Sequence, residues 1–304
     1  VISIGYLYTI VGSLNMAYIS QTISSMSDRR GLYLIGAVMI FVFCMKGALF
    51  PLFTWMNRSY VAPPIAVSII FGALLTKVGL YSIIRTYGLF YYESNFIKSY
   101  LLILGAISIV AGCIGAIYQK DLKQIVVFNI VISLGVMVCG TATLNTFGVK
   151  GALFYAVNDI LLKAALFIIV GLIIYVSGVK YIQKCGLIKK YPLLGWTYFI
   201  VVLSLSGVPP FSGFYSKALI IKGLVTNNNL FIAILVALSG LVVFYSLIKI
   251  FLNVFYDNIN KNLILKPLPK GVQIPLIAVV AIALIIGVST NLLDGFFDKG
   301  IQMV

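Results

Sequence analysis

The 304-residue chain is strongly apolar and basic, with 62% hydrophobic residues, 10% charged residues and a formal net charge of +15. Soluble domains carry roughly 25% charged residues, so the composition excludes an ordinary soluble enzyme. The basic residues interrupt hydrophobic runs and do not form a patch with interleaved aromatic side chains, so we expect no nucleic-acid partner. The composition predicts one transmembrane domain over residues 1–304, surrounded by the lipid bilayer.

Nine apolar runs follow one another along the chain, separated by short loops rich in charge, Gly, Asn or Pro. They cover residues 1–19, 32–56, 63–84, 100–118, 124–144, 148–176, 194–225, 230–256 and 273–293. Most of them reach the roughly 20 residues of a helical membrane crossing, and they are continuous rather than alternating. We therefore predict an all-α polytopic transmembrane helical bundle of about nine helices. Because the chain opens VISIGYLYTI, without Met or a basic leader, we expect further helices before it in the natural protein.

Two of these runs contain helix breakers. Pro51 interrupts the run 32–56, and Gly207, Pro209, Pro210 and Gly213 interrupt the run 194–225. Proline removes a backbone donor and leaves carbonyl groups free, which is tolerated at membrane depth only against protein or a water-filled cavity. A simple packing kink is the alternative. A lysine close to each break favours two broken helices with a functional role.

Charged side chains also occur inside the apolar runs. They are Lys46, Lys77, Asp159, Lys163, Lys217 and Lys249. A charge near the bilayer centre costs a few kcal/mol, so such residues are rare and usually functional, although static ion pairs are the alternative. Burial disfavours the ammonium form, so an enclosed lysine can both take and release a proton. Lys249 lies near the end of its run, where its side chain could equally reach the membrane surface.

Spacing adds two hints about these charges. Asp159 and Lys163 are four residues apart, so on one helix they share a face, either as an acid–base pair for proton transfer or as a static ion pair. Lys46 precedes Lys77 by nearly the same interval as Lys217 precedes Lys249, and each pair begins in an interrupted run. Interrupted helices at matching places in two halves are typical of inverted-repeat transporters.

Metal and cofactor chemistry is not indicated. The chain has no histidine, and its four cysteines lack CxxC spacing, so we expect neither a metal site nor any other cofactor.

Five segments carry a resemblance to a known family. In chain order they read KGALFPLFTW, VAPPIAVSIIFGALLTKVGLYSIIRT, YQKDLKQIVVFNIVISLG, FYAVNDILLKAALFIIVG and GVPPFSGFYSKALIIKG. They resemble the antiporter-like proton-conducting membrane subunits shared by Mrp-type multisubunit Na+/H+ antiporters, respiratory complex I and membrane-bound hydrogenases. The last two segments are most similar to the D-type subunits of the Mrp branch. The resemblance implies a chain of about 14 helices built on two inverted repeats, of which this sequence supplies the C-terminal part.

The resemblance also implies roles for single residues. Lys46 matches the lysine on the broken helix of the first repeat, and Lys77 matches the lysine on the following helix. Lys163 and Lys217 match the central and exit-side lysines of the second repeat. The family's glutamate partner of the first lysine has no counterpart in this sequence.

The function implied is transport and not chemical catalysis. Protons would be relayed along Lys77, Lys46, Asp159, Lys163 and Lys217, coupled to Na+ movement, within a hetero-oligomeric complex of the bacterial cell membrane. Two alternatives stay open: the equivalent component of a redox-driven pump (NADH-quinone oxidoreductase or membrane-bound hydrogenase), and a structural remnant that only packs against its partners.

Overall fold

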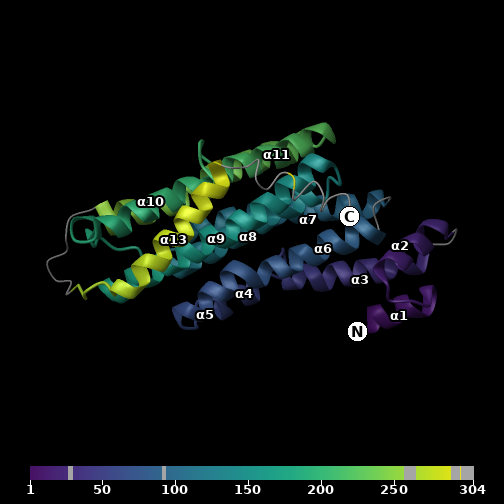
Figure 1. The fold of residues 1–304 in the computed structure, drawn as a ribbon, viewed down its shortest axis with the longest axis horizontal. Helices are drawn as coiled ribbons and strands as arrows, with labels where there is room; N and C mark the ends of the chain where they lie inside the picture. The colour runs from purple at the N-terminus through teal and green to yellow at the C-terminus, as the bar shows by residue number, and fades with distance from the viewer. Residues whose placement is uncertain (27–29, 91–93, 257–264, 289–294, 296–304) are drawn as a thin grey trace.

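The computed structural model describes residues 1–26, 30–90, 94–256, 265–288 and 295. Helices account for most of these residues, and their strand-like pairing is limited to one isolated bridge between Asp121 and Tyr181. The helices run side by side along the long axis of the molecule (Figure 1). They are α1 (Ile2–Val11), α2 (Met16–Ser25), α3 (Arg30–Lys46), α4 (Thr54–Ser59), α5 (Ile65–Ile70), α6 (Thr76–Phe90), α7 (Asn95–Tyr118), α8 (Leu122–Thr141), α9 (Thr146–Ser177), α10 (Pro192–Ser206), α11 (Ser212–Thr226), α12 (Leu230–Ile250) and α13 (Lys270–Val288).

Three short segments of other helix types complete this order. The π-helices η1 (Phe71–Leu75) and η3 (Phe251–Tyr256) continue α5 into α6 and extend α12, and a 3-10 turn, η2 (Leu187–Lys189), precedes α10.

Each of the nine predicted apolar runs contains helix, which confirms the all-α membrane fold. Among the described residues, five helices are long and apolar enough to cross a membrane, or six if α1 and α2, bent by 59°, count as one span. The difference from nine has a physical reason. The runs 32–56 and 194–225 are broken at their Pro and Gly residues, and α13 ends at Val288, beyond which the run 273–293 lies outside the described residues.

Local sequence explains where the helices begin and end. The side chain of Asp121 accepts hydrogen bonds from the backbone N–H groups of Lys123 and Gln124 and caps the start of α8. Asn145 caps α9 in the same way. Gly178 ends α9 with a left-handed φ of 71°, which glycine adopts without the steric cost of a Cβ.

Helices α8 and α9 form the centre of the bundle. Almost every residue of α8 is buried, and α9 packs against α5, η1, α8, α10, α11 and α13. Glycines set the closeness of α7 and α8: a Cβ at Gly135 would stand 2.8 Å from the Gly105 carbonyl oxygen. Small residues at such crossings bring helix backbones into direct contact in membranes. The polar side chains in the middle of α9, Asn158, Asp159 and Lys163, are therefore buried among other helices.

Candidate functional site: a buried ionic axis

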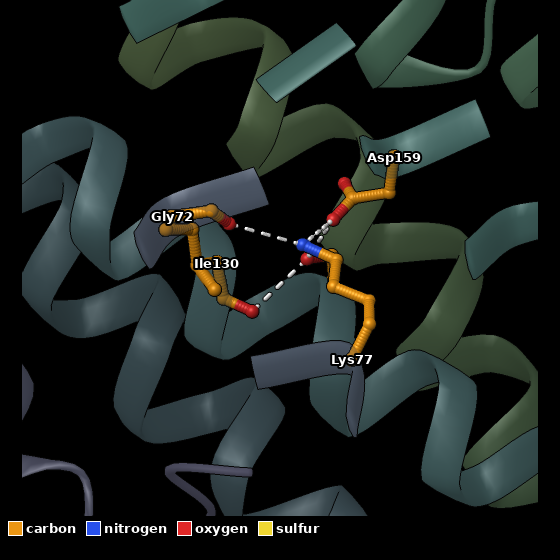
Figure 2. A network of polar contacts seen from close by, with 5 residues as sticks. Gly72, Lys77, Ile130 and Asp159 are labelled. Carbon is orange, nitrogen blue, oxygen red and sulfur yellow. Dashed lines mark hydrogen bonds and ion pairs between the residues drawn. The ribbon is translucent and has the colours of Figure 1, made fainter. Parts of the chain in front are cut away.

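The centre of the site is an ion pair between α6 and α9. The Lys77 ammonium stands 2.7 Å from Asp159 Oδ2, with only 6% of the lysine side chain and none of the aspartate exposed. Lys77 also donates to the Gly72 carbonyl oxygen at 3.2 Å, and Figure 2 shows the ammonium pointing between these two acceptors. The pairing differs from the Asp159–Lys163 pair that the spacing suggested, because the carboxylate turns across the helix interface.

The π-helical segment η1 directly precedes α6 and helps to position Lys77. Gly72 lies within η1, and the ring of Phe167 rests where a side chain at Gly72 would stand. π-Helical turns occur frequently at functional sites, because they change which residues of a helix face inward. Here the segment sets the direction of α6 and supplies the carbonyl that holds the Lys77 ammonium.

Helix α8 provides a second partner for the carboxylate. Ser133 Oγ lies 3.1 Å from Asp159 Oδ2 and 3.0 Å from the Ile130 carbonyl oxygen, which is also part of the network in Figure 2. Asp159 Oδ1 has no hydrogen-bond partner among the described residues. One carboxylate oxygen is thus held in place, and the other is left with accepting capacity.

The other two lysines of the second half lie close by. Lys163 is buried one turn further along α9, within electrostatic reach of Asp159 and Lys77. Lys217 is buried on α11, with its ammonium 5.6 Å from the centre of the Tyr155 ring. Three lysines, one each on α6, α9 and α11, are therefore buried in the interior of the bundle, and one of them, Lys77, pairs with the Asp159 carboxylate.

The break between α10 and α11 is built around Lys217. Its ammonium donates to the carbonyl oxygens of Leu205 and Ser206, both at 2.9 Å. These carbonyls belong to the last turn of α10, where the helix dipole favours a cation. Gly207, at φ 84°, ends α10, and a Cβ there would stand 3.0 Å from the Lys217 side chain. The predicted breaker thus provides a docking place for an ammonium group.

Hydroxyl groups connect this break to α9. Ser212 Oγ donates to Asn158 Oδ1 at 2.6 Å, so its contact with Ser204 Oγ at 2.9 Å must be donated by Ser204. All three side chains are buried, and Asn158 precedes Asp159 on α9. Pro209 and Pro210 lie on the exposed turn between the helices, and Gly213 packs its bare Cα under the Ser204 carbonyl.

Two predicted site residues lie apart from this cluster. Lys46 is the last residue of α3, just before the turn with Pro51, and its side chain is exposed. Lys249 is half-buried on α12 and reaches the Ile117 carbonyl oxygen at 3.5 Å. The structure therefore buries Lys77, Asp159, Lys163 and Lys217 inside the bundle, but neither Lys46 nor Lys249.

A cavity lies at one end of the bundle, beyond the start of α8. This cavity of about 540 Å³ is lined by the start of α5, the start of α8 and the end of α9, including Asp121, Lys123 and Lys180. Lys123 donates to the carbonyl oxygens of Val61 and Pro63 at its rim, both at 3.0 Å. With a rise of about 1.5 Å per residue, Ser133 lies about 15 Å further along α8.

No group of three potential metal ligands occurs in the part of the chain that the structure describes. The four cysteines are free thiols, three of them buried.

Ionisable side chains that are enclosed in a helical membrane bundle beside a broken helix are typical of ion-translocating membrane proteins. Residues 1–242 match the family described as NADH:quinone oxidoreductase/Mrp antiporter, transmembrane. The chain belongs to this family.

Among relatives, the chain is 37% identical over 99% of its length to the D-type subunit of the Na+/H+ antiporter of Bacillus subtilis, of which it covers 62%. Among solved structures, a chain of the Mrp complex of Dietzia sp. superposes with a TM-score of 0.88 at 22% identity, over 96% of this chain and 62% of that one. A chain of an archaeal membrane-bound sulfane sulfur reductase gives a TM-score of 0.88 at 26% identity, over 94% and 49%. The chain thus spans about three fifths of the length of the first two relatives.

Proposed function

We propose that this chain is the proton-translocating part of a multisubunit Na+/H+ antiporter, in the place of the D-type subunit of the Mrp complexes. The observation that carries the proposal is the enclosed Lys77–Asp159 pair, continued by Lys163 and Lys217. A structural ion pair alone would need one lysine for one carboxylate. A cluster with more bases than acids can hold a variable number of protons, which is what a relay requires.

The proton path would run along α9. A proton arriving through the cavity near Lys123 would reach Lys77, pass to Asp159 and move on to Lys163. From there the hydroxyl groups of Ser212 and Ser204, which are linked to Asn158, and intervening water would carry it toward Lys217. The Lys217 ammonium donates a hydrogen bond to a carbonyl oxygen at the end of α10. Each lysine accepts one proton and releases one, so no group is consumed and no cofactor takes part.

We propose Lys46 and Lys249 as two further proton-accepting groups beside this path. The exposed ammonium of Lys46 would face the part of the full-length protein that lies outside this sequence. Lys249 lies one turn from Ser246, which accepts a hydrogen bond from the buried Asn129 at 3.1 Å. The Asn129–Ser246 hydrogen bond therefore links α8 to α12 one turn before Lys249.

We further propose that the nine apolar runs are nine membrane crossings and that the two broken helices, α3–α4 and α10–α11, are equivalent elements of an inverted repeat. The protein would act with other subunits in a bacterial cell membrane, as a transporter and not as an enzyme. Support comes from the family match and from the antiporter relative of Bacillus subtilis.

The test is Na+-dependent dissipation of a pH gradient in inside-out vesicles from an antiporter-deficient host that expresses the full-length gene with its neighbours. Lys77→Ala and Lys46→Ala should abolish the Na+ response while the complex still assembles, and Lys249→Ala should reduce it less. Full Na+-dependent activity in Lys77→Ala would refute the relay.

A second candidate is the matching component of a redox-driven complex, because the chain superposes equally well on a chain of an archaeal respiratory complex. Purification of the tagged protein from its native membrane would distinguish the two. Small antiporter subunits in the purified complex support the first candidate, whereas iron–sulfur or flavin-containing subunits support the second.

A further inference from the structure

One end of the bundle carries more positive charge than the other. At this end α9 and α12 finish and α8, α10 and α13 begin, and its described lysines include Lys120, Lys180, Lys184, Lys189, Lys190 and Lys266. The opposite end, where α7 and α9 begin and α11 finishes, carries Lys98, Lys150 and Lys222. The excess of lysine assigns the first end to the cytoplasmic side, where the membrane leaflet is rich in anionic lipids.

A groove opens at this end between α10 and α13. Both helices pack on α9 but touch each other little. The groove has a volume of about 750 Å³ and lies between Lys190 and Tyr191, just before α10, the segment 265–268, and the first turns of α13. Its walls are mostly apolar, with Leu268, Ile274 and Ile277 among them, and the side chains of Ile274 and Ile277 are exposed. The groove continues toward α9 as a smaller apolar hollow that contains Leu193 and Leu276. Such a surface accommodates a hydrocarbon chain.

The chain segment that closes the groove is fixed in place. Tyr191 donates its hydroxyl hydrogen bond to the Lys266 carbonyl oxygen at 2.8 Å, and the Lys266 backbone N–H donates to the Val176 carbonyl oxygen at 3.0 Å. Leu265 and Pro267, on either side of Lys266, line the groove. The site is therefore formed before any ligand arrives, which lowers the entropic cost of binding.

Lys190 supplies a positive charge on the groove wall. Its ammonium lies 3.4 Å from the Leu265 carbonyl oxygen and 5.8 Å from the centre of the Tyr191 ring. No carboxylate pairs with it among the described residues, so it has donors left for an anion. Trp196, exposed one turn into α10, is of the residue type that occupies the headgroup level of a membrane.

We propose that this groove binds an anionic phospholipid of the cytoplasmic leaflet. The phosphate would accept hydrogen bonds from Lys190, and one acyl chain would lie along Ile274 and Ile277 between α10 and α13. The occupant is a lipid and not a peptide, because the groove joins one cation, Lys190, to a mostly apolar wall on which Ile274 and Ile277 are exposed, which suits a phosphate that carries an acyl chain.

Photocrosslinking in the assembled complex tests this site. The purified full-length complex is incubated with a phosphatidylglycerol that carries a photoreactive acyl chain, and the labelled peptides are mapped by mass spectrometry. We expect labelling of peptides from the first turns of α10 and α13, competed by unmodified phosphatidylglycerol and not by phosphatidylcholine. Lys190→Ala should lower this labelling about fivefold, the effect of one lysine near an anionic membrane surface.

Two further variants serve as controls for the role of Lys190. Lys189→Ala removes the neighbouring positive charge, which does not line the groove, and should leave the labelling unchanged; Lys190→Arg should retain it. No labelling at these helices, equal labelling by photoreactive phosphatidylcholine, or equal losses in Lys189→Ala and Lys190→Ala would overturn the proposal. Because crosslinking does not depend on transport, it can succeed or fail independently of the antiporter activity.

Discussion

Removing one partner of the buried ion pair should destabilise the bundle more than removing both. At the 2.7 Å separation of the Lys77 ammonium and Asp159 Oδ2, an effective dielectric constant of about 20 gives a gross attraction of about 6 kcal/mol. Desolvation offsets much of this attraction, but a single substitution leaves the other charge buried without its nearest partner. We therefore expect Asp159→Leu to cost about 3–5 kcal/mol in folding free energy, and Lys77→Met to cost a similar amount.

The double variant Lys77→Met/Asp159→Leu replaces the pair with apolar side chains of similar volume, so it should be more stable than either single variant. Transport should nevertheless stay absent, because no proton acceptor remains at this point of the relay. The measurement is the midpoint of SDS-induced unfolding of the purified protein, followed by circular dichroism, next to the vesicle assay for each variant. Additive losses, with the double variant less stable than either single one, would show that Lys77 and Asp159 are not energetically coupled.

Three other variants probe the surroundings of the pair. Ser133→Ala removes a hydrogen bond to a charged oxygen, worth about 1.5–3 kcal/mol, and should slow Na+-dependent proton movement about tenfold or more. The control Ser82→Ala, on the lipid side of α6, should leave the rate unchanged. Equal rates in the two variants would refute the role of the Ser133 hydroxyl. Lys217→Met should leave the end of α10 without its cation and abolish transport in the vesicle assay, and retained transport would place the proton path elsewhere. Gly213→Ala drives a methyl group into the facing carbonyl of α10 and should lower the free energy of unfolding in SDS by about 1–3 kcal/mol. The control Gly271→Ala places its methyl group in open space and should change the unfolding free energy little. Similar unfolding midpoints for the two variants would contradict the close packing at the break.

Hydropathy predicted the fold well, because the bilayer imposes a minimum length on each apolar helix. All nine runs contain helix, and the breaks after Lys46 and Ser206 lie beside the predicted Pro and Gly residues. The sequence did not reveal that η1 and η3 are π-helical, since no residue type marks that change of hydrogen bonding. It also did not predict the bend between α1 and α2.

Part of the candidate site could also be predicted from the pattern of apolar and charged residues. A lysine or aspartate in an apolar run is conspicuous because it is costly there, and four of the six predicted charges meet in the interior. The partner of Asp159 was not predictable, because spacing reports neighbours on one helix and Lys77 comes from another. Ser133 was missed although a signal existed: Asn129 and Ser133 are polar residues four apart in an otherwise apolar stretch of α8.

The five-residue segment η1 also fixes the angular position of everything after it on α6. Successive residues of an α-helix are rotated by about 100° about its axis, so adding or removing one residue turns the rest of the helix by that amount. The wider π-helical turn of η1 rotates the chain less per residue, so it accommodates an extra residue while α5 and α6 keep their faces aligned. Inserting one residue after Leu75, in the α-helical part, would instead turn the Lys77 side chain by about 100° away from Asp159. The hydrogen-bonding pattern of this one turn, and not only the identity of its residues, is part of what places the ammonium group beside its acid.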